Sequence, residues 1–418
     1  MKRVDIMRCG TLIIFFAVVA QAAWCQAEEI HVSDAAQLQE LLSQPLADVT
    51  IRLAPGTYEL TPQSAVDSTC GNCEDPATEV PITVGVRISG RNVVLQGPEL
   101  GEALIVTHAG YGLYVKDCMD CRIEGLVITG GERDPDGNAT DAAIVAKYST
   151  LDIVNNRILD NIGDSTTVNT TVVGIMGICG REGAKLTIEG NEIIRNSWDG
   201  IALYRRASAT IVRNVIDGVD KARGKQVGGG RGVGIGVTWN ATAEIGGNIV
   251  KRYWKGIGVF VDAWASVRGN VVEDIITWGV TLWDADKGTP LGVFEDNVIY
   301  NTGACGASIT RSKPLDPDID GRFVRNVFVK TAQNPKYDDP EYYCFQTSLA
   351  LHAVPERFEI ADNLFYDNRR ATDDLADFDV ARDEFMKSID NVCKRIARSP
   401  LLSKTDFARD YCGVGKKQ

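Results

Sequence analysis

The sequence predicts an all-β solenoid, and three observations lead to this prediction. A short phrase recurs along most of the chain, apolar and variable residues alternate around each copy, and the copies follow one another too closely to leave room for a helix. Alternation with a period of two indicates a strand with one buried face. A repeat that holds only such strands buries its apolar face against its neighbours, so stacked repeats share one continuous core.

The recurring phrase is an apolar residue, two variable residues, Asn, one variable residue and a second apolar residue, as in residues 153–158. Successive Asn positions are about 30 residues apart on average, a spacing typical of solenoids. A tight bend between strands needs a residue that tolerates the left-handed conformation and whose side chain satisfies backbone groups. We therefore interpret these asparagines as a structural ladder. They are Asn156, Asn191, Asn214, Asn248, Asn270, Asn297, Asn326 and Asn363.

A second phrase, Gly-apolar-variable-apolar, precedes most copies, as in residues 200–203. The apolar residues of this phrase face the core, and the residues that alternate with them point outward. The coil near Gly174 aligns ambiguously, and Met176 and Ile178 are its expected members. The first outward column reads Tyr114, Val145, Ala202, Gly236, Gly258, Thr281, Ser308 and Ala350, and the second reads Lys116, Lys147, Tyr204, Thr238, Phe260, Trp283, Thr310 and His352.

Both ends of the repeat carry segments that predict caps. Ser33 is positioned to N-cap a short helix whose leucines share one face, and this helix would cover the open edge of the stack. The repeat stops near residue 370, residues 380–397 predict a helix, and residues 399–403 predict a far cap. The expected organisation is one solenoid domain over residues 28–370 and a partly helical capping tail over residues 371–418.

The N-terminus predicts a signal peptide over residues 1–27. Three basic residues precede a short apolar stretch over residues 12–20, which is too short to span a membrane. Small residues offer two cleavage sites, so the mature chain begins near Ala23 or Glu28. The expected location is secreted or periplasmic.

Eleven cysteines include the close pairs Cys70/Cys73 and Cys118/Cys121. Two CxxC pairs are compatible with a zinc site, whereas an exported chain favours disulfides. Cys393 and Cys412 are expected to tie down the C-terminal tail. The connectivity stays open, because it cannot be deduced from spacing.

The formal net charge is -12, which argues against general nucleic-acid binding, because such binding neutralises phosphates with clustered Lys and Arg. A local basic site remains compatible with this charge. The three His residues are isolated in the sequence, which argues against a His-based metal centre. No later segment is apolar and long enough to span a bilayer, so stable membrane insertion is not expected. The oligomeric state is not predicted.

Residues 51–58, with the run Pro-Gly-Thr-Tyr at their end, together with the two recurring phrases, resemble the right-handed parallel β-helix superfamily. This group includes pectate lyases, polysaccharide hydrolases and epimerases, and NosD-like periplasmic proteins. The resemblance covers about residues 30–405 and implies a right-handed parallel β-helix with a helical N-terminal cap. The adjacent-Asp and Gly-His-Gly motifs of polygalacturonase-like hydrolases are absent, as is the Arg, Pro and Arg pattern of pectate lyases.

The two outward columns predict a groove for a carbohydrate polymer. Small residues form its floor, aromatic residues form its wall, and ten coils would span about 50 Å. Gly236 and Gly258 are expected to leave depth, and the loop around Lys225 would attract acidic sugars. The expected substrate-binding residues are Tyr204, Phe260, Trp283, His352 and Lys225.

Charged residues that follow the outward strands predict the chemistry of the groove. Arg205 or Arg311 would serve as base or clamp of a lyase that acts on a uronate. Asp262, Asp284 and Asp286 could hold Ca²⁺, which prefers several oxygen ligands. Two of these carboxylates could instead act as the acid and base of a glycosidase. The expected catalytic residues are Asp284, Arg205, Arg311 and Asp262.

Two hypotheses about function stay open. The chain is either an exported enzyme that cleaves an acidic, uronate-containing polysaccharide, or a non-catalytic polysaccharide-binding or NosD-like periplasmic accessory protein. The predicted groove favours the enzyme, and the missing family motifs favour the accessory protein. A polysaccharide is the expected partner in both cases.

Overall fold

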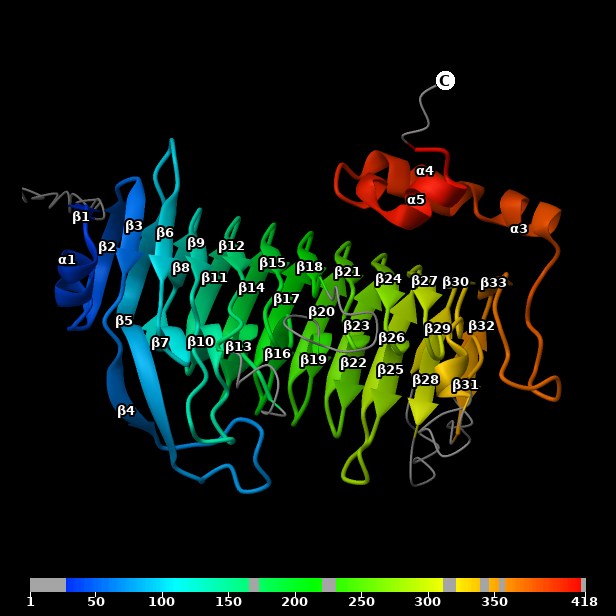
Figure 1. The fold of residues 1–418 in the computed structure, drawn as a ribbon, viewed down its shortest axis with the longest axis horizontal. Coiled ribbons are helices and arrows are strands. Elements are labelled where there is room, and N and C mark those ends of the chain that lie inside the picture. The colour runs from blue at the N-terminus through cyan, green and yellow to red at the C-terminus, as the bar shows by residue number, and fades with distance from the viewer. Residues whose placement is uncertain are drawn as a thin grey trace, which may run out of the picture.

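The computed structural model describes residues 28–164, 173–219, 231–310, 321–338, 346–352 and 358–414. Their strands wind into a long solenoid of stacked coils, with β1 (Glu28–Val32) at one end of the stack (Figure 1). Nearly all strand pairs are parallel, with β4 (Gln63–Asp67) and β5 (Val80–Gln96) as an antiparallel pair near the start. The stack opens with β1 (Glu28–Val32) and β2 (Leu46–Leu53).

Each later coil contributes one strand to each of three faces, and β5 is long enough to run along the first and second. The first face consists of β7 (Tyr111–Met119), β10 (Ala142–Lys147), β13 (Met176–Arg181), β16 (Ile201–Leu203), β19 (Val233–Val237), β22 (Lys255–Phe260), β25 (Trp278–Trp283), β28 (Ala307–Thr310) and β31 (Leu349–Leu351).

The second face follows directly and is hydrogen-bonded in the same parallel manner. It consists of β8 (Cys121–Glu124), β11 (Thr150–Val154), β14 (Lys185–Glu189), β17 (Ser208–Val212), β20 (Thr242–Gly246), β23 (Trp264–Arg268), β26 (Leu291–Glu295), β29 (Arg322–Val324) and β32 (Glu359–Ala361).

The third face is a separate 11-stranded sheet that closes the coils. It consists of β3 (Gly56–Glu59), β6 (Ala103–Val106), β9 (Val127–Thr129), β12 (Arg157–Leu159), β15 (Glu192–Ile194), β18 (Val215–Asp217), β21 (Ile249–Lys251), β24 (Val271–Ile275), β27 (Val298–Thr302), β30 (Val327–Val329) and β33 (Leu364–Tyr366).

The predicted asparagine ladder is confirmed along the bend between the second and third faces. The Oδ1 atom of Asn270 accepts hydrogen bonds from the backbone N–H and the Nδ2 of Asn248, at 2.9 and 3.0 Å, and the pattern repeats from Asn156 to Asn363. One detail of the prediction was wrong, because the asparagine itself does not adopt the left-handed conformation. The residue before each ladder asparagine adopts the left-handed conformation, as Arg213 does with φ 57°.

The predicted columns of the first face are confirmed by the strand register, in which Val145 pairs with Tyr114 and Gly258 pairs with Thr281. The expectation for the ambiguous coil was wrong. Cys179 occupies the first column and Arg181 the second, whereas Ile178 faces the core.

The N-terminal helix α1 (Ala35–Leu41) lies at the open end of the stack, as expected (Figure 1). Its N-cap is Asp34 rather than Ser33, and the Asp34 side chain accepts a hydrogen bond from the backbone N–H of Gln37 at 2.9 Å. Leu38 and Leu42 are buried against the first coils.

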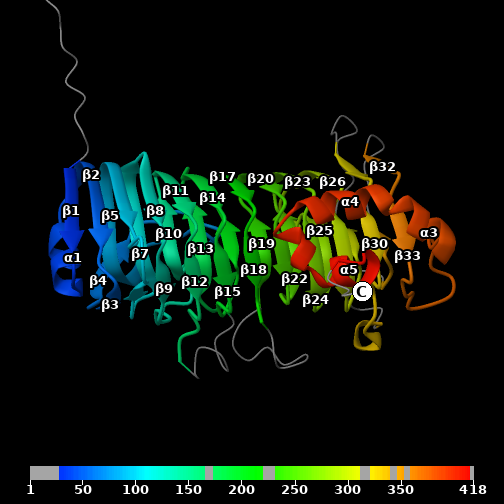
Figure 2. The same ribbon diagram turned by 90° about the horizontal axis from the view of Figure 1, so that it is seen from above.

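The C-terminal tail corrects the prediction of a far cap. The helices α4 (Asp390–Arg398) and α5 (Asp406–Tyr411) lie along the third face, and α3 (Arg382–Ser388) lies near β33 (Figures 1 and 2). The short 3-10 helices are Pro335–Tyr337 and Leu402–Lys404. The tail packs there because Ile249, Val271 and Val298 point outward and need an apolar cover. Among the described residues, no helix is long and apolar enough to cross a membrane.

Candidate functional site

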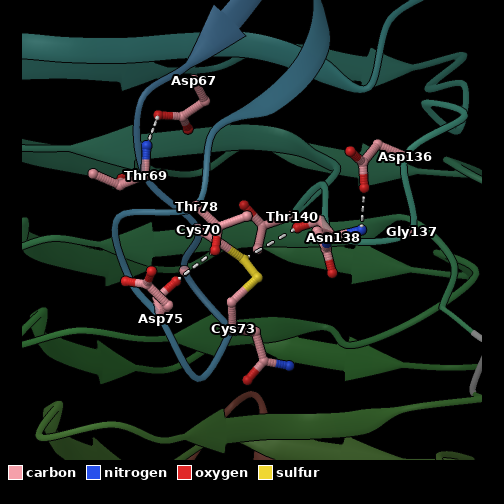
Figure 3. Close-up of a disulfide and its surroundings, with 12 residues drawn as sticks. Asp67, Thr69, Cys70, Cys73, Asp75, Thr78, Asp136, Gly137, Asn138 and Thr140 are labelled. Atoms are coloured by element: carbon pink, nitrogen blue, oxygen red, sulfur yellow. Dashed lines mark hydrogen bonds between the residues drawn. A yellow bond between two sulfur atoms is a disulfide. The ribbon is translucent and has the colours of Figure 1, made fainter.

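The first face is covered over its N-terminal coils. Residues 68–79, which connect β4 to β5 and are called the plug below, cross in front of this face, with Cys70 and Cys73 at the centre of Figure 3. Cys70 packs in one cluster with the outward residues Val145, Cys179 and Ala202, which are at most 1% exposed. The predicted groove is therefore filled along this part of the face.

Disulfides bind both CxxC pairs, Cys70 to Cys73 and Cys118 to Cys121, so the disulfide alternative is confirmed over the zinc alternative. A third disulfide joins Cys393 to Cys412 within the C-terminal tail. The Cys70–Cys73 disulfide closes a tight turn in the plug, where the backbone N–H of Cys70 donates to the carbonyl oxygen of Pro76 at 3.0 Å.

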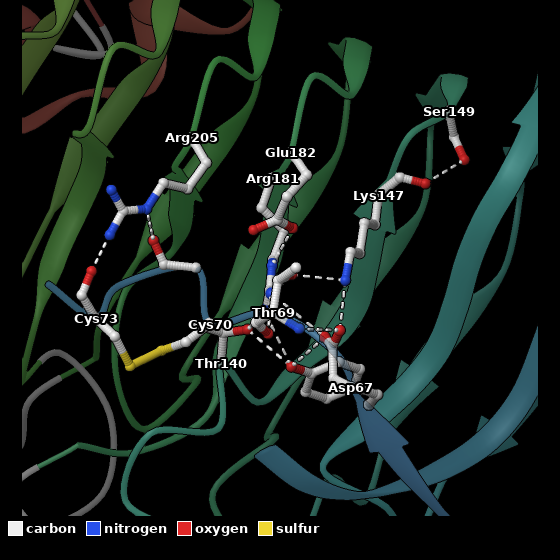
Figure 4. Close-up of polar contacts among 12 residues, drawn as sticks. Asp67, Thr69, Cys70, Cys73, Thr140, Lys147, Ser149, Arg181, Glu182 and Arg205 are labelled. Atoms are coloured by element: carbon white, nitrogen blue, oxygen red, sulfur yellow. Dashed lines mark hydrogen bonds and ion pairs between the residues drawn. A yellow bond between two sulfur atoms is a disulfide. The ribbon is translucent and has the colours of Figure 1, made fainter. Parts of the chain in front are cut away.

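A buried polar network holds the start of the plug against the first face (Figure 4). Lys147 and Arg181, both from the second outward column, form ion pairs with the carboxylate of Asp67, and all three side chains are fully buried. Arg181 also donates to the carbonyl oxygen of Thr69 at 2.6 Å. Removing Asp67 would leave the buried charge of Lys147 without its ion-pair partner, which is strongly destabilising.

Arg205, a predicted catalytic residue, also holds the plug. Its Nε donates to the carbonyl oxygen of Gly71 at 3.1 Å, its Nη2 donates to that of Cys73, and its guanidinium lies 4.3 Å from the ring centre of Trp239. These contacts engage its donors with the protein itself and make it a positioning residue for the plug.

A pocket of about 700 Å³ lies beside the plug, at Asn72 and Glu74. Its lining combines aromatic rings, cationic side chains and two carboxyl groups. The aromatic residues are Trp198, Tyr204, Trp239, Trp254, Phe260 and Trp283, the cationic residues are Arg231, Lys255 and Lys287, and the acidic residues are Glu74 and Asp199.

The three predicted aromatic residues all line this pocket, with different exposure. Tyr204 is only 6% exposed, because the plug cluster packs on its ring. Phe260 meets Trp283 edge to face, with 6.3 Å between ring centres, and its ring lies across Gly258, so that a Cβ there would be 2.1 Å from the Phe260 Cζ. The expected depth is thus missing at Gly258 and present at Gly236, where the nearest atom to a Cβ would be 3.8 Å away.

Asp199 is a candidate functional residue that sequence reasoning missed. One carboxylate oxygen accepts the backbone N–H of Val233 at 2.6 Å, and the other is the atom that lies 3.8 Å from the Cβ position at Gly236. Burial raises the pKa of Asp199 to about 7, against the opposing effects of the Val233 N–H and of Lys255. Asp199 directly precedes the Gly200 phrase, whereas the catalytic residues predicted from the sequence all follow their strands.

Cationic side chains line the same pocket as this carboxyl group. Lys255 pairs in register with Val233, the residue that hydrogen-bonds Asp199, and its Nζ lies 5.8 Å from the ring centre of Trp283. Arg231 lies 5.6 Å from the ring of Trp198, and its Nε donates to the carbonyl oxygen of Ser197 at 2.9 Å. The pocket therefore presents positive charge beside aromatic faces, within an acidic protein.

The other predicted site residues that the structure describes do not line this pocket. Asp284 is buried and accepts the backbone N–H of Asp286 at 3.1 Å, and Asp262 accepts that of Asn240 at 2.7 Å. Both therefore hold turns. His352 follows β31, and its backbone N–H donates to Ile309.

Arg311 and Lys225 lie outside the described residues, so their predicted roles stay predictions. Within the described parts of the chain, no group of three or more His, Cys, Asp or Glu side chains is arranged to hold a metal ion. The calcium site at Asp262, Asp284 and Asp286 also stays a prediction.

The stacked coils, the ladder and the pocket on the first face define a right-handed parallel β-helix protein. Residues 101–272 match the family described as the right handed beta helix region. No curated protein matches the sequence.

Several solved structures are similar in fold at low identity. The A-module of the mannuronan C-5 epimerase AlgE4 of Azotobacter vinelandii is 13% identical, with a TM-score of 0.42 over 81% of this chain and 84% of that one. An exopolygalacturonase of Thermotoga maritima is 10% identical, with a TM-score of 0.43 over 80% and 91%. The surface adhesin PfbA of Streptococcus pneumoniae is 10% identical, with a TM-score of 0.41 over 82% and 71%.

Proposed function

We propose that the protein binds an acidic carbohydrate that contains uronate units, in the pocket beside Asn72 and Glu74 of the plug. The observation that carries this proposal is the pairing of aromatic faces with cationic side chains in one pocket. Sugar rings stack their apolar faces on aromatic rings, and charged donors such as Lys255 and Arg231 suit a carboxylate. Local potential rather than net charge steers a ligand into a cleft, so the overall charge of -12 does not oppose this binding.

The chemistry that this pocket supports best is β-elimination. Asp199, with a pKa of about 7, is partly ionised at neutral pH, which suits a proton acceptor. Its carboxylate takes the proton from C5 of the uronate while Lys255 stabilises the charge that develops on the sugar carboxylate. The bond between C4 and its glycosidic oxygen breaks, a C4–C5 double bond forms, and the departing oxygen takes a proton from water.

A glycosidase is supported less well. That reaction needs two carboxyl groups on either side of the scissile bond. Glu74, the other acidic residue of the pocket lining, forms an ion pair with Lys287. The non-catalytic binding protein remains the second candidate, because the family motifs that mark hydrolases and pectate lyases are absent from the sequence.

Titration calorimetry with a uronate oligosaccharide and its carboxyl-reduced, neutral counterpart tests the binding. We expect the acidic form to bind at least about tenfold more tightly, a difference of about 1.4 kcal/mol. Lys255→Met should remove this preference. Lys185→Met is the matched control, because Lys185 is exposed on β14 of the second face. Equal affinity for the two ligands, or binding of neither, would show the proposal to be wrong.

Ultraviolet absorbance of unsaturated uronates tests the reaction. We expect product from the wild-type protein, none from Asp199→Asn, and product from Asp284→Asn, which alters the carboxyl group predicted from the sequence alone. Binding without any product would identify the protein as the non-catalytic candidate. Product from Asp199→Asn at the wild-type rate would exclude Asp199 as the proton acceptor.

A further inference from the structure

The plug forms one wall of the pocket and is fixed there by several contacts. Trp239 donates from its Nε1 to the Oδ1 of Asn72 at 2.9 Å, and Glu74 is paired with Lys287. Arg205 binds two carbonyl oxygens of the plug from below. Both Asn72 and Glu74 belong to the pocket lining, so the wall is part of the site.

The plug also covers the part of the first face where further sugar units of an acidic ligand would lie. Side chains of the protein itself occupy these positions. Lys147 and Arg181 occupy the outward column that continues into the pocket through Tyr204. The carboxylate of Asp67 is the acid that they bind, and none of these side chains is accessible to solvent. A carbohydrate chain that runs along the stack therefore meets the plug after it fills the pocket.

We infer that the pocket receives the end of an acidic carbohydrate chain rather than a stretch inside it. This inference rests on the proposed function and adds the form of ligand that the pocket accepts. A chain interior needs a groove that continues on both sides of the bound unit. The cluster that joins Cys70 to Val145, Cys179 and Ala202 closes the groove on one side.

The stoichiometry of binding to acidic oligosaccharides fractionated by length tests this inference directly. A site for chain ends binds one protein per chain whatever the length, because the number of suitable ends is constant. A site for chain interiors binds more proteins as the chain grows. Titration calorimetry with short and long fractions of a polyuronate should therefore give the same number of proteins per chain. A number that rises with length would overturn the inference and leave the proposed function intact, whereas absence of binding to every fraction would overturn both.

A variant without the plug gives the converse test. Asp67 and Val80 face each other at the ends of the antiparallel strands β4 and β5. Replacing residues 68–79 by Asn-Gly therefore joins the strands with a two-residue hairpin turn. We expect this variant to bind long chains at more than one protein per chain, because the groove beside Tyr204 is then open.

The double variant Cys70→Ser, Cys73→Ser is the matched control, since it retains every other residue of the plug together with the Arg205 and Asp67 contacts. We expect it to keep one protein per chain. Circular dichroism verifies that both variants retain the strand signal. A folded plug-less variant that still binds one protein per chain would contradict the inference, and the stoichiometry of the wild-type protein remains decisive if that variant does not fold.

Discussion

Each ladder asparagine from Asn156 to Asn326 ties its own coil to both neighbours through one side chain. Asn270 donates from its Nδ2 to the carbonyl oxygen of Ile245 in the preceding coil and to Asn297 in the next, and its Oδ1 accepts from Asn248. The left-handed residue before it, Gly269, makes the turn itself. The turn and the bridge between coils are thus made by two neighbouring residues.

Asn270→Ala should lower the free energy of unfolding by about 2 kcal/mol, because it leaves buried groups of the neighbouring coils without partners. Asn363→Ala is the matched control at the last, half-buried rung, and its effect should be smaller. Denaturant titration measures both values. Affinity for the acidic ligand should not change in either variant. A loss of binding by Asn270→Ala at unchanged stability would show that the ladder is not structural.

Asp199 should make stability depend on pH in a defined direction. Burial keeps folded Asp199 protonated up to about pH 7, whereas an unfolded Asp ionises at about pH 3.9. The stability that the protonated form contributes is therefore complete below about pH 4 and is lost as the pH rises towards 7. Asn at this position can keep the Val233 hydrogen bond and never ionises.

Melting temperatures of the wild-type protein and of Asp199→Asn therefore test the raised pKa. We expect little difference at about pH 4 and a higher melting temperature for the variant at about pH 8. A difference that is constant across this range would mean that the pKa of Asp199 is not raised by its surroundings.

At the scale of elements, the sequence predicts what repeats and misses what does not. The outward columns could be predicted because parallel register carries one alignment from coil to coil. The prediction from the Gly-apolar-variable-apolar phrase failed for the coil at Gly177, because Gly180 stands where the second apolar residue was expected. Leu186 fills that space, and its nearest atom lies 2.6 Å from where a Cβ of residue 180 would be. The plug could not be predicted, because Arg205 meets Gly71 across a separation of 134 residues.

The tail helices show the same limit. An amphipathic segment at residues 380–397 requires some apolar surface, and the sequence alone does not identify which one. The outward residues Val271 and Val298 of the third face supply it, so this part of the tail covers a side of the stack.

Phe385→Ala tests this placement of the tail. Phe385 is fully buried and stacks on Tyr366 of β33, with 4.6 Å between ring centres. We expect the variant to lose about 3 kcal/mol of stability, as is usual when a buried aromatic ring is removed. Phe378→Ala is the control, because Phe378 is 39% exposed, and it should cost much less. Equal melting temperatures for Phe385→Ala and the wild-type protein would show that the tail does not pack on the third face.

At the scale of the whole molecule, the acidic surface and the basic pocket serve separate purposes. A net charge of -12 keeps the molecules apart, while cations beside aromatic rings select the ligand locally. The disulfides agree with the predicted export, because such bonds persist in oxidising compartments.

Export can be tested on the native protein. We expect N-terminal sequencing to find a mature chain that begins near Ala23 or Glu28, and thiol titration under denaturing conditions to find both CxxC pairs oxidised. An intact N-terminus together with reduced CxxC pairs would contradict the prediction.

The most direct test of the central claim compares two tryptophan variants in one binding experiment. Trp283 lines the pocket, whereas Trp264 lies on β23 of the second face, outside it. Titration calorimetry with a uronate oligosaccharide should show that Trp283→Ala weakens binding about tenfold, or about 1.4 kcal/mol, while Trp264→Ala binds like the wild-type protein. The account is contradicted if Trp283→Ala binds the oligosaccharide as tightly as the wild-type protein, or if Trp264→Ala is the variant that loses affinity.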